Sequence, residues 1–180
     1  SGTIISDSIA TVRGSAETLT FRNNIFKDFS FTAKAEDTTF RSVIQSSSLN
    51  ILGQSELKDF NSLIDTKPDN FNFTINWDNK DKTLNKGSFS SRGLISRDSS
   101  ASGKPLLCIA IDSSSVWVKN NRWKIMESKI LIDSNALNIN NINITNGARF
   151  YRMNGVVSEN PGDTLYLQFN DIDIFPLNYL

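Results

Sequence analysis

The chain has 180 residues, enough for one domain with a sizeable core, and its 19 basic side chains balance 19 acidic ones. This neutral balance lacks the cationic excess that nucleic-acid binding requires, so we expect no nucleic-acid partner. Histidine is absent, which removes the commonest general base and the commonest metal ligand and excludes most familiar hydrolase arrangements.

The first half of the chain predicts β-strands in which apolar and polar residues alternate. The clearest lies in D-N-F-N-F-T-I-N-W-D-N. Side chains in a strand have a period of two, so Phe71, Phe73, Ile75 and Trp77 share one face and the asparagines and threonine between them share the other. One side of this strand is therefore apolar and the other is wet.

One early segment departs from this alternation. Leu57, Phe60, Leu63 and Ile64 recur at spacings of three and four, and a serine that can cap a helix precedes them. This spacing predicts one short amphipathic helix over residues 55–65. We expect its apolar stripe to plug the end or the mouth of the sheet.

The second half predicts further strands of the alternating kind. Two of them carry these apolar residues on one face: Leu107, Ile109 and Ile111 in the first, and Leu165, Leu167 and Phe169 in the second. Residues 119–121 predict a hairpin turn between two short tryptophan-containing strands. At Asn140 and Asn141 the alternation slips by one residue, which indicates a bulge or corner. Residues 160–163, N-P-G-D, predict a type II turn.

About ten strands joined by short connections predict an all-β fold, with an antiparallel sheet built from consecutive hairpins. Each strand is apolar on one side only, so the sheet must fold into a sandwich, close into a barrel or curl into a trough. We expect residues 1–180 to form a single domain with antiparallel strands curled into an open, taco-like groove. A β-sandwich is the alternative.

No combination of residues predicts an enzyme, a cofactor or a metal site. The chain has no G-x-S-x-G, no phosphate-binding loop and no C-x-x-C. Asp171 and Asp173 are spaced to share one face of a strand, as a carboxylate pair would be, but a solvated outer face explains them more simply. A right-handed β-helix enzyme would need stacked coils of constant length and a carboxylate cluster, and the sequence shows neither.

The aromatic residues allow a second hypothesis, a carbohydrate-binding or adhesin module of the sandwich type. The tryptophans and tyrosines could stack against sugars, although packing within the protein is the commoner use of aromatic rings in β-proteins. The candidates are Trp77, Trp117, Trp123, Tyr151, Tyr166 and Tyr179.

Residues 116–180 resemble the TamB and AsmA-like family of envelope proteins. The resemblance rests on the strand W-K-I-M, then L-N-I-N-N-I-N-I-T-N-G, an alternating strand L-Y-L-Q-F-N, and the close N-D-I-D-I-F-P-L-N. An earlier N-F-T-I-N-W-D-N followed by G-S-F is similar to such a unit. The richness in asparagine and serine is similar in style to Bacteroidetes-type members.

The resemblance implies a repeating β-groove with an apolar interior, in a periplasmic protein whose parent chain is anchored in the inner membrane. This chain, which does not begin with methionine, would be a fragment of it. The implied role is non-catalytic: the groove shields phospholipid acyl chains, or nascent outer-membrane β-strands, between the two membranes. The implied partner is an outer-membrane barrel protein of the TamA or BamA kind. The candidate groove residues are Phe71, Phe73, Ile75, Trp77, Leu107, Ile109, Ile111, Leu165, Leu167 and Phe169.

Overall fold

The computed structural model describes residues 2–6, 9–53, 55–97 and 105–171 of the chain. In these ranges the regular secondary structure consists of β-strands alone, so the fold is all-β, as predicted. The strands are β1 (Gly2–Ser6), β2 (Ile9–Phe21), β3 (Asn24–Glu36), β4 (Thr39–Ile51), β5 (Ser55–Lys67), β6 (Asn70–Asp78), β7 (Lys86–Arg97), β8 (Pro105–Ile111), β9 (Ser114–Val118), β10 (Asn121–Ile125), β11 (Ser128–Ile132), β12 (Ala136–Asn146), β13 (Arg149–Ser158) and β14 (Leu165–Asn170).

All of these strands belong to one antiparallel sheet, which follows the order of the chain. β8 and β9 lie end to end along β7, and β10 and β11 lie end to end along β12. Each of these two pairs acts as one long strand with an interruption, because β9 pairs with β10 and β8 with β11. With β8 and β9 counted as one strand, and β10 and β11 as another, the sheet is a continuous meander in which each strand is hydrogen-bonded to the strands before and after it.

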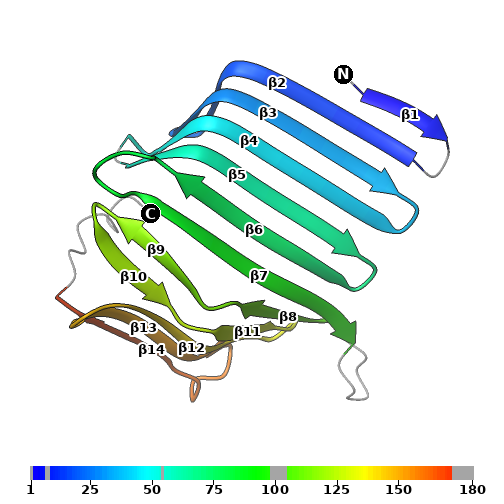
Figure 1. The fold of residues 1–180 in the computed structure, drawn as a ribbon. Helices are drawn as coiled ribbons and strands as arrows, with labels where there is room; N and C mark the ends of the chain where they lie inside the picture. Colours follow the sequence, from blue (N-terminus) through cyan, green and yellow to red (C-terminus); the bar gives the residue numbers. More distant parts are fainter. Residues whose placement is uncertain (1, 7–8, 54, 98–104, 172–180) are drawn as a thin grey trace.

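The meander curls into an open trough, and a sandwich is not formed. Figure 1 shows β2–β7 as one broad wall, with β11–β14 turning beneath it. The accessible surface area is 12130 Å², whereas a compact monomer of this size exposes about 8,700 Å². No large side chain among the described residues is fully buried. The curled sheet has no second layer packed against it in the described ranges.

The predicted helix over residues 55–65 is wrong, since this segment is strand β5. Asp59 has a positive φ of 49° and forms a local bulge. Residues 57 and 60 therefore lie on the same face although they are three positions apart, which is the spacing that suggested a helix. Beyond the bulge the period of two returns, so Ile64 shares that face and Leu63 points to the opposite one. In the described ranges no helix has the length and apolar character needed to cross a membrane.

The bulge in β5 belongs to a row that crosses four strands. The register of the flanking residue pairs places four residues level with one another: Glu17 on β2, Asp28 on β3, Ser47 on β4 and Asp59 on β5. Asp28 also has a positive φ, of 47°, and its carboxylate accepts a hydrogen bond from the Ser47 hydroxyl at 2.7 Å. Past this row the ends of β2–β5 turn away from the broad wall (Figure 1). The row is therefore a crease in the sheet.

A second crease crosses β8–β13, where the sheet curls under. It runs through the interruption between β8 and β9 and the matching one between β10 and β11. It continues at Asn141, whose φ is 57°, where the pairing of β12 with β13 shifts register. The predicted bulge at Asn140 and Asn141 is confirmed. The crease ends at Gly155, whose φ of 130° only glycine adopts readily.

The turns follow from local chemistry. Lys119 and Asn120 both have positive φ and join β9 to β10, so the predicted hairpin is present as the tight turn that suits the twist of paired strands. The predicted turn at residues 160–163 is also present, since Asp163 N donates to Asn160 O. It is not type II, because Gly162 does not have the positive φ which that geometry requires at the third position.

The crease makes a prediction about backbone strain at Asp28. Asp28→Val should lower the free energy of unfolding by about 1–2 kcal/mol relative to Asp28→Gly, because a left-handed conformation is costly for residues with a Cβ, and a β-branched side chain tolerates it least. Both variants lose the hydrogen bond to Ser47, so the comparison isolates the backbone. Urea unfolding followed by circular dichroism measures the difference. The control is the same comparison at Ser30 on the same strand, where φ is ordinary. Ser30→Val should lower the free energy of unfolding less relative to Ser30→Gly, and equal differences at the two positions would contradict the crease.

Candidate functional site

The ten residues predicted to line a groove share one face of the sheet. Directly opposed residues in neighbouring strands point to the same face. Phe71 opposes Gly93, which opposes Ile109, and the chain of pairs continues through β11, β12 and β13 to Leu165. The other seven candidates lie two, four or six positions from Phe71 on β6, Ile109 on β8 or Leu165 on β14. The period of two in a strand therefore keeps them on the same side. We call this side the inner face and its reverse the outer face.

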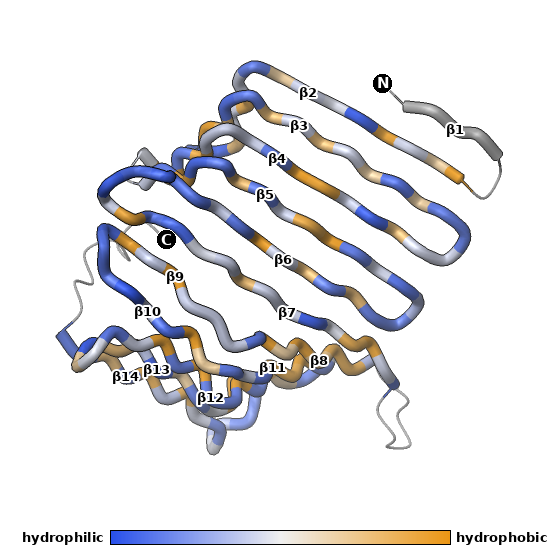
Figure 2. The backbone as a smooth tube through the Cα atoms, viewed as in Figure 1, coloured by the Kyte–Doolittle hydropathy of each residue, from blue (hydrophilic) through white to orange (hydrophobic). Residues whose placement is uncertain are grey.

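Small buried side chains identify the inner face as the inside of the curl. Six serines are less than 9% exposed although no second layer covers them. Ser48 beside the first crease is on the outer face, and the other five are on the inner face: Ser42, Ser46, Ser62, Ser91 and Ser128. Side chains converge on the concave side of a bent sheet, so small ones become buried among their larger neighbours there. The inner face thus alternates bulky apolar side chains with serine, alanine and glycine, and Figure 2 shows the hydropathy changing from residue to residue along the strands.

Two glycines on β7 allow aromatic rings to lie flat against the backbone. A Cβ at Gly93 would stand 2.0 Å from Phe71 Cε1, and one at Gly87 would stand 2.6 Å from the ring of Trp77. Each ring belongs to the residue directly opposite its glycine on β6. This arrangement covers glycine backbone with apolar surface, as aromatic residues do in other sheets.

Aromatic contacts cross the inner face at three places. Phe26 meets both Phe29 and Phe60 edge-on across the first crease, with ring centroids 5.7 and 6.2 Å apart. Phe73 and Phe89 make a similar contact at 6.5 Å between β6 and β7. Trp123 and Tyr151 lie 6.0 Å apart, with an angle of 41° between their ring planes, although β12 lies between their strands. The inner face is therefore held in shape by rings that span neighbouring and next-neighbouring strands.

Most of the exposed large hydrophobic side chains lie on the inner face. They include Leu167 and Phe169 on β14, which are 57% and 55% exposed. The others on this face are Val12, Phe21, Phe40, Ile95, Val118, Ile132 and Val157. The outer face is mainly polar, with Asn72, Thr74 and Asn76 on β6 as predicted, and with isolated exceptions such as Trp117 and Tyr166.

Where the inner face reaches the strand ends, it becomes polar around a hollow of about 370 Å³, which we call the rim hollow. Trp123, Tyr151 and Val118 form its apolar wall, and Lys119, Asn121, Arg149 and Asp171 supply polar groups. Arg149 Nε donates to Asp171 Oδ2 at 3.1 Å, and both side chains are half exposed or more. Asp173, the other member of the spaced carboxylates that a solvated face explains more simply, lies outside the described residues. Of the six predicted stacking residues, Trp123 and Tyr151 meet here, while Trp77 covers Gly87, Trp117 and Tyr166 face outward and Tyr179 is outside the described residues.

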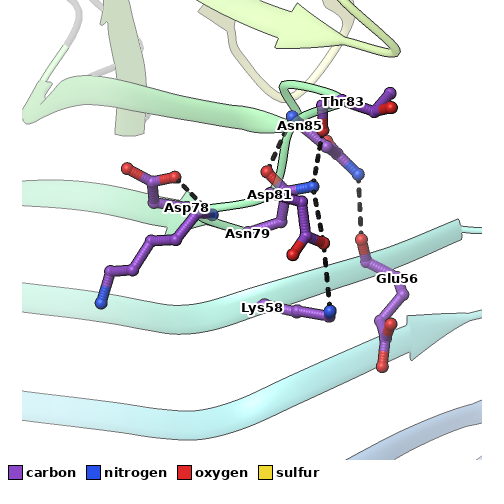
Figure 3. A network of polar contacts seen from close by, with 8 residues as sticks. Glu56, Lys58, Asp78, Asn79, Asp81, Thr83 and Asn85 are labelled. Carbon is purple, nitrogen blue, oxygen red and sulfur yellow. Dashed lines mark hydrogen bonds and ion pairs between the residues drawn. The ribbon is translucent and has the colours of Figure 1, made fainter.

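A loop between β6 and β7 fastens this end of the sheet. Asn79 N donates to Asn85 O, and Asn79 Oδ1 accepts from Asn85 N, which closes the loop on itself. Asn85 Nδ2 reaches Glu56 O on β5 at 2.9 Å, and Asn120 Oδ1, in the β9–β10 turn, accepts from Leu84 N at 2.6 Å. Figure 3 shows the bonds between Asn79 and Asn85 and from Asn85 to Glu56, together with the contact between Lys58 and Asp81. The loop therefore links β5 and the β9–β10 turn to the ends of β6 and β7.

Charge adds to this fastening. Lys58 Nζ lies 3.1 Å from Asp81 Oδ2, and Lys80 pairs with Asp59 at the first crease. The hydrogen bond to Asp81 and the attraction of its carboxylate raise the pKa of Lys58 above its ordinary value of 10.5. Asp59 raises the pKa of Lys80 in the same way. Among the described residues no group of three or more acidic or cysteine side chains is placed to hold a metal ion.

The comparisons with known proteins give no identification: no family model, no curated protein and no solved structure matches this chain.

Sequence reasoning missed the part of the inner face supplied by β10–β13. Trp123, Ile130, Ile139, Ile144 and Tyr151 join it through pairing across the second crease. Their alternation is visible in the sequence. Which face of each short strand continues the groove depends on the register between strands, and no local pattern in the sequence encodes it.

The ring over Gly93 predicts an asymmetric response to adding one methyl group. Gly93→Ala should destabilise the protein by about 1–3 kcal/mol, because the new Cβ would overlap the ring of Phe71. The matched control is Gly14→Ala, also on the inner face, where no atom lies within 4 Å of a new Cβ. This control should be neutral or stabilising by up to about 1 kcal/mol. Chemical denaturation measures both, and similar values for the two variants would contradict the described packing.

The ion pairs of the loop predict that the stability of the protein depends on pH in the alkaline range. Because folding raises the pKa of Lys58 and Lys80, their contribution is complete below 10.5 and is lost as the pH rises through the raised values. The stability difference between the native chain and the variant with both Lys58→Met and Lys80→Met should therefore stay constant near neutrality and shrink above that pH. Denaturation midpoints across pH 7–12 measure it, with Lys129→Met as the control. A difference that grows with pH would contradict the assignment.

Proposed function

We propose that the chain is a non-catalytic β-groove module whose inner face shields the acyl chains of phospholipids. The observation that carries this proposal is an apolar face on a single-layer sheet, with no part of the described chain packed against it. Soluble monomers rarely leave large contiguous apolar patches uncovered, and those that do commonly use them for binding. The ten groove residues predicted from the sequence all belong to this face.

The chemistry of the inner face suits a flexible hydrocarbon better than a rigid ligand. Its bulky side chains are phenylalanine, isoleucine, leucine and tryptophan, and the serines between them are buried rather than presented to a ligand. Each methylene that moves from water onto such a surface contributes about 0.8 kcal/mol, without direction or specificity. A chain can therefore change position along the face at little cost, as a conduit requires.

The wider setting of the proposal comes from the resemblance to the TamB and AsmA-like family. The resemblance supports a periplasmic location, a parent protein anchored in the inner membrane, and a partner of the TamA or BamA kind in the outer membrane. The continuous meander supports it too, because a sheet built of consecutive hairpins can extend along its axis as part of a longer groove. A nascent outer-membrane β-strand is the second client that such a groove could shield.

Adjacent residues on β7 test which face meets lipid. Leu94 and Ile95 are both apolar and are 51% and 47% exposed, yet they point to the outer and inner faces respectively. A photo-crosslinking amino acid at position 95 should capture phospholipid from vesicles or from the producing cell, and the same amino acid at position 94 should capture at least several-fold less. Mass spectrometry of the crosslinked products measures both.

The same experiment separates the alternatives. Equal capture at both positions, or capture at position 94 alone, would defeat the lipid-groove proposal. Peptide rather than lipid at position 95 would favour the β-strand client. Tyr166 and Leu167 on β14 repeat the comparison at the other end of the sheet, since they too are adjacent, well exposed and opposite in direction.

A further inference from the structure

The rim hollow differs from the rest of the inner face in its chemistry. Elsewhere that face alternates apolar side chains with small buried ones, whereas the hollow combines two aromatic rings with two cations, a carboxylate and an amide. Its volume of about 370 Å³ lies at the lower end of the range for small-molecule sites, about 300–1,000 Å³. Acyl-chain shielding needs none of these polar groups.

The aromatic wall is suited to a ligand with one apolar face. Trp123 and Tyr151 are half-buried, and the 41° between their planes makes an open V rather than a closed stack. Trp and Tyr each combine a large apolar surface with a polar tip, which favours ligands that are apolar on one side and polar at the edge. A pyranose ring has this form, with C–H groups on its face and hydroxyl groups around its rim.

The polar groups of the hollow favour hydroxyl groups over an anion. The Asp171 carboxylate largely neutralises Arg149, so Lys119 is the remaining unpaired charge among the residues that line the hollow. The bond to Asp171 uses only Nε, and the other guanidinium N–H groups can donate to a ligand. Asp171 can accept hydrogen bonds at the same time, so the pair offers adjacent donors and acceptors. A sugar hydroxyl group both donates and accepts, so it can use both members of this pair, whereas a phosphate can use only the donors.

A buried amide group lies beside the hollow without lining it. Asn146 lies directly opposite Arg149 at the end of β12, and the β10–β12 register brings it level with Trp123. Its Nδ2 is buried and has no hydrogen-bond partner. Buried donors without a partner are uncommon in folded proteins and call for an explanation such as a bound polar group. Rotation of the Asn146 side chain toward the hollow would bring this donor to a hydroxyl group of a ligand.

We propose that the rim hollow binds a saccharide, with one pyranose ring packed against Trp123 and Tyr151 and its hydroxyl groups hydrogen-bonded to Arg149 and Asp171. The ligand is a neutral sugar, presented either as free oligosaccharide or as the headgroup of a glycolipid whose acyl chains would lie along the inner face. The site is formed by β9, β10, β13 and the residue after β14, and it does not depend on whether the inner face shields lipid.

Saturation-transfer difference NMR on the whole 180-residue chain tests the proposal. The probes are methyl pyranosides of glucose, galactose and mannose, and vesicles of phosphatidylcholine with or without a neutral diacyl glycolipid. At least one probe should bind, with saturation strongest on the C–H protons of one ring face. Binding of the methyl pyranosides would indicate free saccharide as the ligand, and binding of glycolipid vesicles alone would indicate the headgroup.

Matched variants decide the place of binding. Trp123→Ala should weaken binding at least about tenfold, whereas Trp117→Ala, on the outer face of the neighbouring strand, should leave it unchanged. Asp171→Ala alters a side chain that is 70% exposed, so it should preserve folding and still weaken binding. Failure of every probe to bind would overturn the proposal, as would equal losses in the Trp123 and Trp117 variants. Lipid crosslinking at position 95 should be the same in the Asp171 variant as in the native chain, which separates this result from the lipid proposal.

Discussion

Hydrogen bonding between consecutive strands is the interaction on which the rest of this structure depends. In most β-proteins a second sheet or a helix covers the apolar face and supplies much of the stability through burial. Here the described strands form one layer, and only four hydrophobic side chains are buried: Ala33, Leu49, Phe60 and Ile139. The backbone ladder and the contacts between side chains on neighbouring strands must therefore maintain both the shape and the order of the chain.

The curl of the sheet is achieved without losing the division between its two faces. Inserting one residue into a strand reverses the direction of every side chain beyond it. At the first crease the alternation of side chains is interrupted at the same level in each of the strands β2–β5. Their apolar side chains therefore remain on one side through the bend. Phe26, Phe29 and Phe60 then pack against one another across it. The bend and the continuity of the apolar face come from the same residues.

The sequence was informative where structure depends on local periodicity. It predicted the all-β fold, the open curl, the hairpin at Lys119 and Asn120 and the bulge at Asn140 and Asn141. It failed at residues 55–65, because a bulge at Asp59 produces an apolar spacing of three that a helix also produces. The positive φ of Asp59 depends on the level pairing of four strands and on Lys80, and neither is visible in a window of neighbouring residues.

The rim hollow could not have been predicted for a related reason. Trp123 and Tyr151 are far apart in the sequence and come together only because β10 and β13 both flank β12 in one register. Composition suggested that aromatic residues could stack against a sugar, but it could not tell which of them meet. The resemblance to an envelope family gave a functional hypothesis, and the residues themselves gave the architecture that is consistent with it.

The continuous meander also has a consequence for how the molecule folds. When β8–β9 and β10–β11 are each counted as one interrupted strand, every strand bonds only to its neighbours in the chain, so the protein behaves as a nearly one-dimensional array. Folding can then begin at any hairpin and spread outward one strand at a time, without the slow closure of long loops. Damage to one strand would also be confined, because strands on either side keep their own partners. A long groove of this kind could grow or shorten in evolution by whole hairpins while every remaining strand keeps its place.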